Sequence, residues 1–150
     1  MKAPSFKLPD QAGIIHDLSE VRGSWALVYF YPKDNTTGCT IEACAIRDSY
    51  PQFKKLGITV FGISVDPVSS HKKFSEKYQL PFTLLADEDK KTVRMYGVWA
   101  KKKFMGRGYM GTLRTSFLID PKGRIAKIYQ SVKPPTHADE ILKDLKSLIG

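Results

Sequence analysis

At 150 residues, with 42% hydrophobic and 26% charged residues, the chain has the size and composition of one globular domain, residues 1–150. It contains no apolar run of about eighteen residues, and its first residues lack the apolar core of a secretory signal, which predicts no membrane association and a cytoplasmic location. The net charge of +9 is spread along the chain, and only Lys101, Lys102 and Lys103 form a tight cluster, so we expect a solvated basic surface rather than a nucleic-acid interface.

The first half of the chain predicts two buried strands on either side of a long helix. Breakers up to about Gly23 predict an irregular stretch or a short hairpin. Apolar runs then predict strands at residues 26–31 and 58–64, each covered on both faces. Turn residues lead into a helix from about Cys39 to Leu56. The apolar stripe of this helix is expected to contain Ile41, Cys44, Ala45, Tyr50 and Phe53.

The second half continues the alternation of strands and helices. It first predicts a helix that Ser69 or Ser70 caps and that ends near Tyr78, a strand at 82–85 and a helix at 89–96. A glycine-containing loop with the lysine cluster follows. Strands at 113–119 and 124–129 around the turn 120–123, and a helix at 137–148, complete the chain. This order indicates an α/β protein with a central mixed β-sheet flanked by helices and an N-terminal extension. The thioredoxin-like fold has the same order.

Two cysteines, Cys39 and Cys44, are too few to hold a domain of this size together, and a bond between residues five apart would constrain very little chain. A close pair in a reducing compartment indicates catalytic or redox chemistry, or an incidental pair. The histidines, at 16, 71 and 137, show none of the usual zinc-ligand spacings. We therefore expect neither a metal nor another cofactor.

The position of Cys39 favours reactivity, because unpaired N–H groups and the helix dipole favour a thiolate at a helix start. A small buried residue that happens to begin a helix is the alternative. On an intact helix, residues five apart lie about 7.5 Å apart along the axis, beyond the roughly 7 Å limit for a disulfide. Cys44 can therefore bond to Cys39 only if the start of the helix unwinds. A core cysteine on the apolar stripe explains Cys44 equally well, and the two roles can hold at different stages of a cycle.

Residues 29–44 resemble the active-site segment of the peroxiredoxins and, more closely, that of the peroxiredoxin Q group, also called bacterioferritin comigratory proteins. The family pattern is Pro, three residues, Thr, two residues, Cys, which Pro32, Thr36 and Cys39 fill. Cys44 marks a large part of that group. The similarity continues in order through residues 82–89, 96–99, 103–106 and 114–120, so it covers nearly the whole chain. Most of the group has proline where this chain has Thr37, a less rigid residue that can cap a helix.

The resemblance implies roles for five side chains. Cys39 would be the peroxidatic nucleophile and become a sulfenic acid. Arg114 would stabilise the thiolate and the charge that grows on the departing oxygen. Thr36 would hold the peroxide in line with the sulfur, Pro32 would shield the thiolate, and Glu42 would orient Arg114. The alternatives are structural: a solvated arginine, a capping threonine, a proline that ends a strand, and an acid favourable at a helix start.

Cys44 would complete the cycle as the resolving cysteine. Its thiolate would attack the Cys39 sulfenic acid, release water and leave an intramolecular disulfide that a dithiol, expected to be thioredoxin, would reduce. The resemblance thus implies a thiol-dependent peroxidase that reduces hydrogen peroxide and organic hydroperoxides to water and alcohols. Because both cysteines lie in one chain, we expect a monomer.

Two other functions stay open. A thioredoxin-like thiol-disulfide oxidoreductase would use Cys-x-x-Cys, which the chain lacks, and a cis-proline, which is absent from the matching residues 112–115. A basic non-enzymatic binding module would keep its function without Cys39 and lose it without the lysine cluster.

Overall fold

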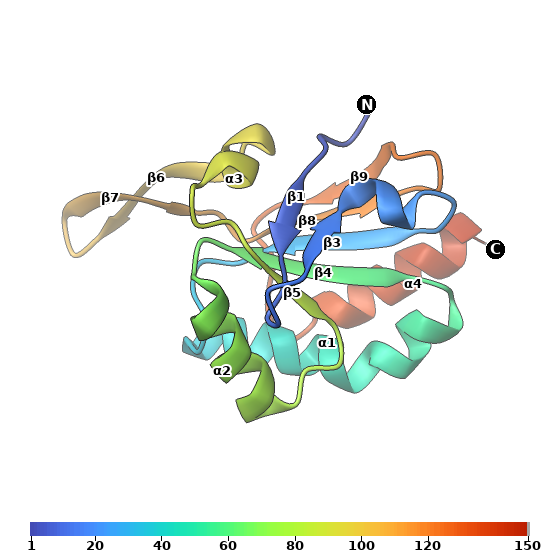
Figure 1. Cartoon of the computed structure of the whole chain (residues 1–150), viewed down its shortest axis with the longest axis horizontal. Helices are drawn as coiled ribbons and strands as arrows, with labels where there is room; N and C mark the ends of the chain where they lie inside the picture. Colours follow the sequence, from blue (N-terminus) through green and yellow to red (C-terminus); the bar gives the residue numbers. More distant parts are fainter. Residues whose placement is uncertain (150) are drawn as a thin grey trace.

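The computed structural model describes residues 1–149, and a five-stranded mixed sheet lies at its centre (Figure 1). Its strands are β3 (Ala26–Phe30), β4 (Thr59–Ser64), β5 (Thr83–Ala86), β8 (Thr115–Ile119) and β9 (Ile125–Tyr129), in the order β5-β4-β3-β8-β9. The strands β3, β4 and β5 are parallel, whereas β8 runs antiparallel to both β3 and β9. All five residues of β3 are buried, as the continuous apolar run predicts.

Helices cover one face of this sheet. The long helix α1 (Thr37–Lys55), α2 (Val68–Tyr78) and α4 (His137–Ile149) lie on this side (Figure 1). Residues of alternate strand positions, such as Leu27 and Leu118, pack against them in one core cluster. This layer places the beginning of α1 next to the carboxyl end of β3.

The other face is covered by short elements. They are β1 (Lys7–Pro9), β2 (Ile15–Asp17), the 3-10 helix η1 (Leu18–Val21) and α3 (Lys91–Met95). The intervening strand residues, Val28 and Phe117 among them, form a second core cluster with these elements. The predicted mixed sheet, flanked by helices, is therefore present, and so is the predicted N-terminal extension. Among residues 1–149, no helix has both the length and the apolar character needed to cross a membrane.

The loop predicted around the lysine cluster is wrong. Residues in this region form β6 (Trp99–Phe104) and β7 (Arg107–Thr112), an antiparallel hairpin that projects from the body of the protein (Figure 1). Met105 and Gly106 connect the strands, and both have positive φ, of 51° and 78°. Two such residues match the twist of a tight hairpin, whereas the glycines alone suggested a loop. We refer to residues 99–112 as the arm.

The predicted apolar stripe of α1 is only partly right: Phe53 is buried, and Ala45 and Tyr50 pack against the core, but the first turns differ. Ile41 is 42% exposed, and Cys44 and Ala45 are only half-buried. The buried residues of α1 are Cys39, Glu42, Ala43, Ile46 and Phe53. A carboxylate on the buried face concealed this stripe in the sequence.

Three predicted boundaries also shift. The helix that Ser69 or Ser70 was expected to cap already starts at Val68, and Pro67, at its N-cap position, makes no side-chain cap bond. The helix expected at residues 89–96 is shorter, and the Asp87 carboxylate accepts bonds from the N–H groups of its first turn. The strand expected from Leu113 begins at Thr115, so Arg114 lies in the link between β7 and β8 rather than on a strand. The turn at residues 120–123 is present.

Candidate active site

Cys39 is the third residue of α1 and is only 2% exposed. Thr36 precedes the helix in an extended conformation and makes no side-chain cap bond, because its hydroxyl donates to the Lys33 carbonyl at 3.0 Å. The first N–H groups of α1 therefore lack both an intrahelical partner and a side-chain cap. These donors and the helix dipole favour negative charge at this end of the helix, which is where Cys39 lies.

Arg114 reaches the first turn of α1 from the link between β7 and β8. Its Nη1 donates to Glu42 Oε1 at 2.9 Å, and a Cβ added to Gly38 would lie 3.0 Å from its Nη2. Glycine at position 38 thus makes room for the guanidinium beside the helix start. Burial alone would lower the pKa of Arg114, but the negative charges of Cys39 and Glu42 outweigh it and raise the pKa. Cys39, Arg114 and Glu42 are therefore brought together at the start of α1.

Glu42 is an acid on the buried face of α1. Burial raises its pKa to about 7, although the charge of Arg114 and the bond to it act in the opposite direction. Among residues 1–149, Glu42 Oε2 and the Tyr29 hydroxyl are buried without a hydrogen-bond partner. Only one of the two carboxylate oxygens is satisfied, so the pair with Arg114 is the main interaction that keeps this carboxylate ionised.

Pro32 and Thr36 lie in the loop between β3 and α1. Pro32 is half-buried and Thr36 is exposed. The Thr36 carbonyl accepts the bond from Thr40 N at 2.8 Å, which begins the helix. Both residues thus lie within the segment that ends at Cys39, with Thr36 at its exposed rim.

Cys44 is a free, half-buried thiol further along the unbroken α1, and Cys39 is also free. Their spacing of five residues on an intact helix exceeds what a disulfide can bridge. In this structure the two sulfurs can bond only after the first turns of α1 unwind.

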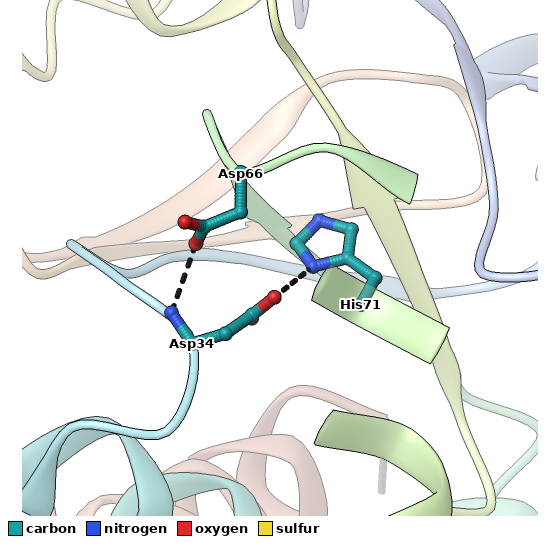
Figure 2. A group of neighbouring side chains, drawn as sticks. All are labelled: Asp34, Asp66 and His71. Carbon is teal, nitrogen blue, oxygen red and sulfur yellow. Dashed lines mark hydrogen bonds and ion pairs between the residues drawn. The ribbon is translucent and has the colours of Figure 1, made fainter. Parts of the chain in front are cut away.

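A buried polar cluster next to this loop was not predicted from the sequence. The Asp34 carboxylate accepts bonds from the Tyr31 hydroxyl at 2.6 Å and the Ser70 hydroxyl at 2.8 Å, and lies 2.6 Å from His71 Nδ1. The Asp34 N–H donates to Asp66 Oδ2 at 2.8 Å (Figure 2). His71 stands out in the sequence only as a histidine on a polar helix, and no local pattern links it to a residue 37 positions earlier.

A second buried histidine forms an arrangement that resembles a catalytic triad. His137 Nε2 lies 2.7 Å from the Ser116 hydroxyl, and its Nδ1 lies 3.1 Å from Glu140 Oε1. Burial lowers the pKa of His137, against the opposing effect of Glu140. Ser116 is 0% exposed, on β8, which lies between β3 and β9 in the sheet. Its hydroxyl is closed to any substrate, so this cluster joins α4 to the sheet rather than forming a nucleophilic site.

Comparison with known proteins places these features in a family. Residues 1–128 match the model of the AhpC/TSA family. The peroxiredoxin Bcp of Escherichia coli strain K12 is 46% identical over 144 residues, which cover 96% of this chain and 92% of the relative. The chloroplastic peroxiredoxin Q of Populus jackii is 49% identical over 148 residues, which cover 97% of this chain and 66% of the relative.

Solved structures agree with this assignment. The bacterioferritin comigratory protein of Xanthomonas campestris superposes with a TM-score of 0.92 and 34% identity, covering 97% of this chain and 92% of that one. A mutant PrxQ of Xylella fastidiosa gives a TM-score of 0.93 and 32% identity, covering 100% of this chain and 98% of that one. These neighbours confirm the predicted thioredoxin-like fold. The chain therefore belongs to the AhpC/TSA family, as a peroxiredoxin of the peroxiredoxin Q and bacterioferritin comigratory protein group.

Proposed function

We propose that this peroxidase reduces hydrogen peroxide and organic hydroperoxides through a two-cysteine cycle within one chain, and that thioredoxin or a similar dithiol recycles it. The observation that carries the proposal is the placement of Cys39, which is buried at an uncapped helix start beside the guanidinium of Arg114. The Xanthomonas campestris neighbour, described for its alkyl peroxide reduction activity, supports the inclusion of organic hydroperoxides.

In the first step the Cys39 thiolate attacks one peroxide oxygen. An S–O bond forms, the O–O bond breaks, and the other oxygen leaves as water or an alcohol after it takes up a proton. Arg114 stabilises the negative charge as it moves from sulfur to the departing oxygen. Thr36, at the rim of the site, orients the peroxide by accepting a hydrogen bond from it, since its own proton is donated to the Lys33 carbonyl. Pro32 limits access of water to the sulfur.

In the second step Cys44 resolves the sulfenic acid. The start of α1 unwinds, the Cys44 thiolate attacks the Cys39 sulfur, and the S–O bond breaks as an S–S bond forms, with release of water. A dithiol then reduces the disulfide by two exchange reactions and is itself oxidised. Because both cysteines belong to one chain, the cycle needs no second copy, and we propose that a monomer carries it out.

The test is consumption of hydrogen peroxide coupled to thioredoxin, with the wild type, Cys39→Ser and Cys44→Ser. We expect no turnover with Cys39→Ser. Cys44→Ser is expected to consume about one peroxide per chain and then stop, because the sulfenic acid persists. Continued turnover of Cys44→Ser with thioredoxin would show that one cysteine suffices. A wild type that consumes no peroxide with any thiol would refute the proposal and favour a disulfide oxidoreductase or a binding module.

A further inference from the structure

The loop before α1 contacts the N-terminal end of α2 through Asp34. The Asp34 carboxylate takes up three contacts, from the Tyr31 hydroxyl, the Ser70 hydroxyl and His71 Nδ1, all between 2.6 and 2.8 Å. The side chains of Asp34 and His71 are 3% and 0% exposed. A buried carboxylate with this many partners fixes its own backbone closely, because leaving any of them unpaired is costly.

The contact between Asp34 and His71 joins an acid and a base. His71 Nε2 lies 2.9 Å from the Leu85 carbonyl, which can only accept, so Nε2 carries a proton. The contact of 2.6 Å between His71 Nδ1 and Asp34 Oδ2 requires a second proton between these two atoms. Whichever atom holds it, the bond between His71 Nδ1 and the Asp34 carboxylate (Figure 2) is short and buried, and His71 Nε2 joins it to Leu85 on β5.

The backbone N–H of Asp34 and the side chain of Asn35 add two further contacts that hold the loop in place. The Asp34 N–H donates to Asp66 Oδ2, which also accepts from the Ser64 hydroxyl at 2.7 Å. Asn35 has a left-handed φ of 59°, and its Oδ1 accepts from the Tyr78 hydroxyl at 3.1 Å. Side chains of Asp34, His71 and Asp66 could in principle ligate a cation, since their donor atoms lie within 4.8 Å of one another. The hydrogen bonds among them account for the arrangement without one.

The attachment stops where the reactive segment starts. Among residues 1–149, the Thr36 side chain bonds only to nearby Lys33, and the next long-range side-chain contacts along the chain are those of Cys39 and Glu42 with Arg114. The segment that must unwind for the Cys39–Cys44 bond thus begins directly after a fixed point. Unwinding can leave Asp34 in place while residues 36–44 move.

We propose that Asp34 and His71 are positioning residues that hold the fixed end of the unwinding segment. They keep Thr36 and Cys39 aligned for attack on the peroxide and return them to the same place after each reduction. This inference rests on the proposed two-cysteine cycle. Without the anchor, the reduced enzyme spends more time with the start of α1 open, so attack on peroxide slows while disulfide formation does not.

The experiment compares His71→Gln with His16→Gln. His16 forms a similar contact, 2.7 Å to Asp10 Oδ2, but lies on β2 away from the loop. In reduced proteins that also carry Cys44→Ser, stopped flow measures oxidation of Cys39 by hydrogen peroxide. In proteins that keep Cys44, rapid-quench mass spectrometry measures the second step alone, the conversion of the Cys39 sulfenic acid to the disulfide. We expect His71→Gln to slow the first rate about tenfold without slowing the second, and His16→Gln to change neither.

Two further variants address the acid. Asp34→Ala is expected to slow oxidation at least as much as His71→Gln. Asp34→Asn is expected to restore the rate to within about threefold of wild type, because its amide can donate to a neutral imidazole and still accept from Tyr31. Equal losses in both rates, or no loss in either, for variants that fold would overturn the proposal.

Hydrogen exchange separates this inference from the proposed cycle. In the reduced protein, amides of residues 36–44 are expected to lose protection in His71→Gln and to keep it in His16→Gln. This measurement needs no peroxide and no turnover. If the wild type fails to reduce peroxide while the exchange result holds, the cycle is wrong and the anchor stands. If wild type turns over normally and protection is the same in all variants, the anchor is wrong.

Discussion

Glu42 and Arg114 form an ion pair next to Cys39 in which the carboxylate is buried and the guanidinium is partly exposed. Burial disfavours the charged form of Glu42. Its carboxylate has one bonded oxygen, and burial raises its pKa to about 7 from a usual value near 4.5. Between these two values the unfolded chain releases a proton that the folded protein retains. The free energy of unfolding therefore falls as the pH rises from about 4.5 to about 7 and levels off above it.

Glu42→Gln should remove this fall, because glutamine does not ionise. The difference between the two pKa values corresponds to about 3 kcal/mol, so wild type should lose up to that amount relative to the variant between pH 5 and pH 7.5. Urea denaturation of the reduced proteins across this range measures it. Parallel profiles for the two proteins would show that burial does not raise the pKa of Glu42.

At the scale of elements, α1 supports both the core and the chemistry. Its buried residues face the sheet, while Ile41, which the sequence pattern placed on that face, is 42% exposed. The observed stripe combines Cys39 and Glu42 with apolar residues further along the helix. The same face thus holds the Cys39 thiol at its start and ordinary core packing toward its end.

Paired substitutions on α1 test this orientation. Ile46→Ala should lower the free energy of unfolding by about 2–5 kcal/mol, because Ile46 is fully buried. Ile41→Ala, the same change five residues earlier, should cost less than about 1 kcal/mol. Chemical denaturation of both variants gives the comparison. An equal loss of unfolding free energy in the two variants would show that Ile41 lies on the buried face, as the sequence pattern predicts.

The contrast shows what a single sequence can predict here. The strand β3 and a helix start close to Cys39 were predictable because a continuous apolar run and a cluster of turn residues are local signals. The arm was missed because Met105, a residue that rarely adopts positive φ, occupies its turn. The pairs Glu42–Arg114 and Asp34–His71 join residues 72 and 37 positions apart, and no local pattern encodes such contacts. The first came only from resemblance to a family.

At the scale of the whole molecule, positive charge predominates. The chain has 24 basic and 15 acidic residues, and the arm contains four cations and no acid. Arg114 follows the arm by two residues, so the basic hairpin and the catalytic region share one connection. A long-range field of this sign attracts anions and is screened by salt.

Oxidation by an anionic fatty-acid hydroperoxide should therefore slow as salt is added. We expect the second-order rate constant to fall about threefold or more between ionic strengths of about 0.01 and 0.3 M. Hydrogen peroxide, which is neutral, should show almost no dependence and serves as the control. Stopped-flow measurements with both substrates give the result, and equal salt dependence would mean that the net charge does not steer substrates.

Thr36 directs its hydroxyl at the Lys33 carbonyl and leaves the start of α1 without a cap. A side-chain cap typically contributes about 1 kcal/mol, which the protein forgoes at this helix start. The N–H groups that a cap would have occupied stay available to attract charge, and the turn that lacks the cap is also easier to unwind. In the proposed cycle, the reactivity of Cys39 and the weakness of the turn around it thus have a common origin, and a mutation that stabilised this turn would be expected to slow formation of the disulfide.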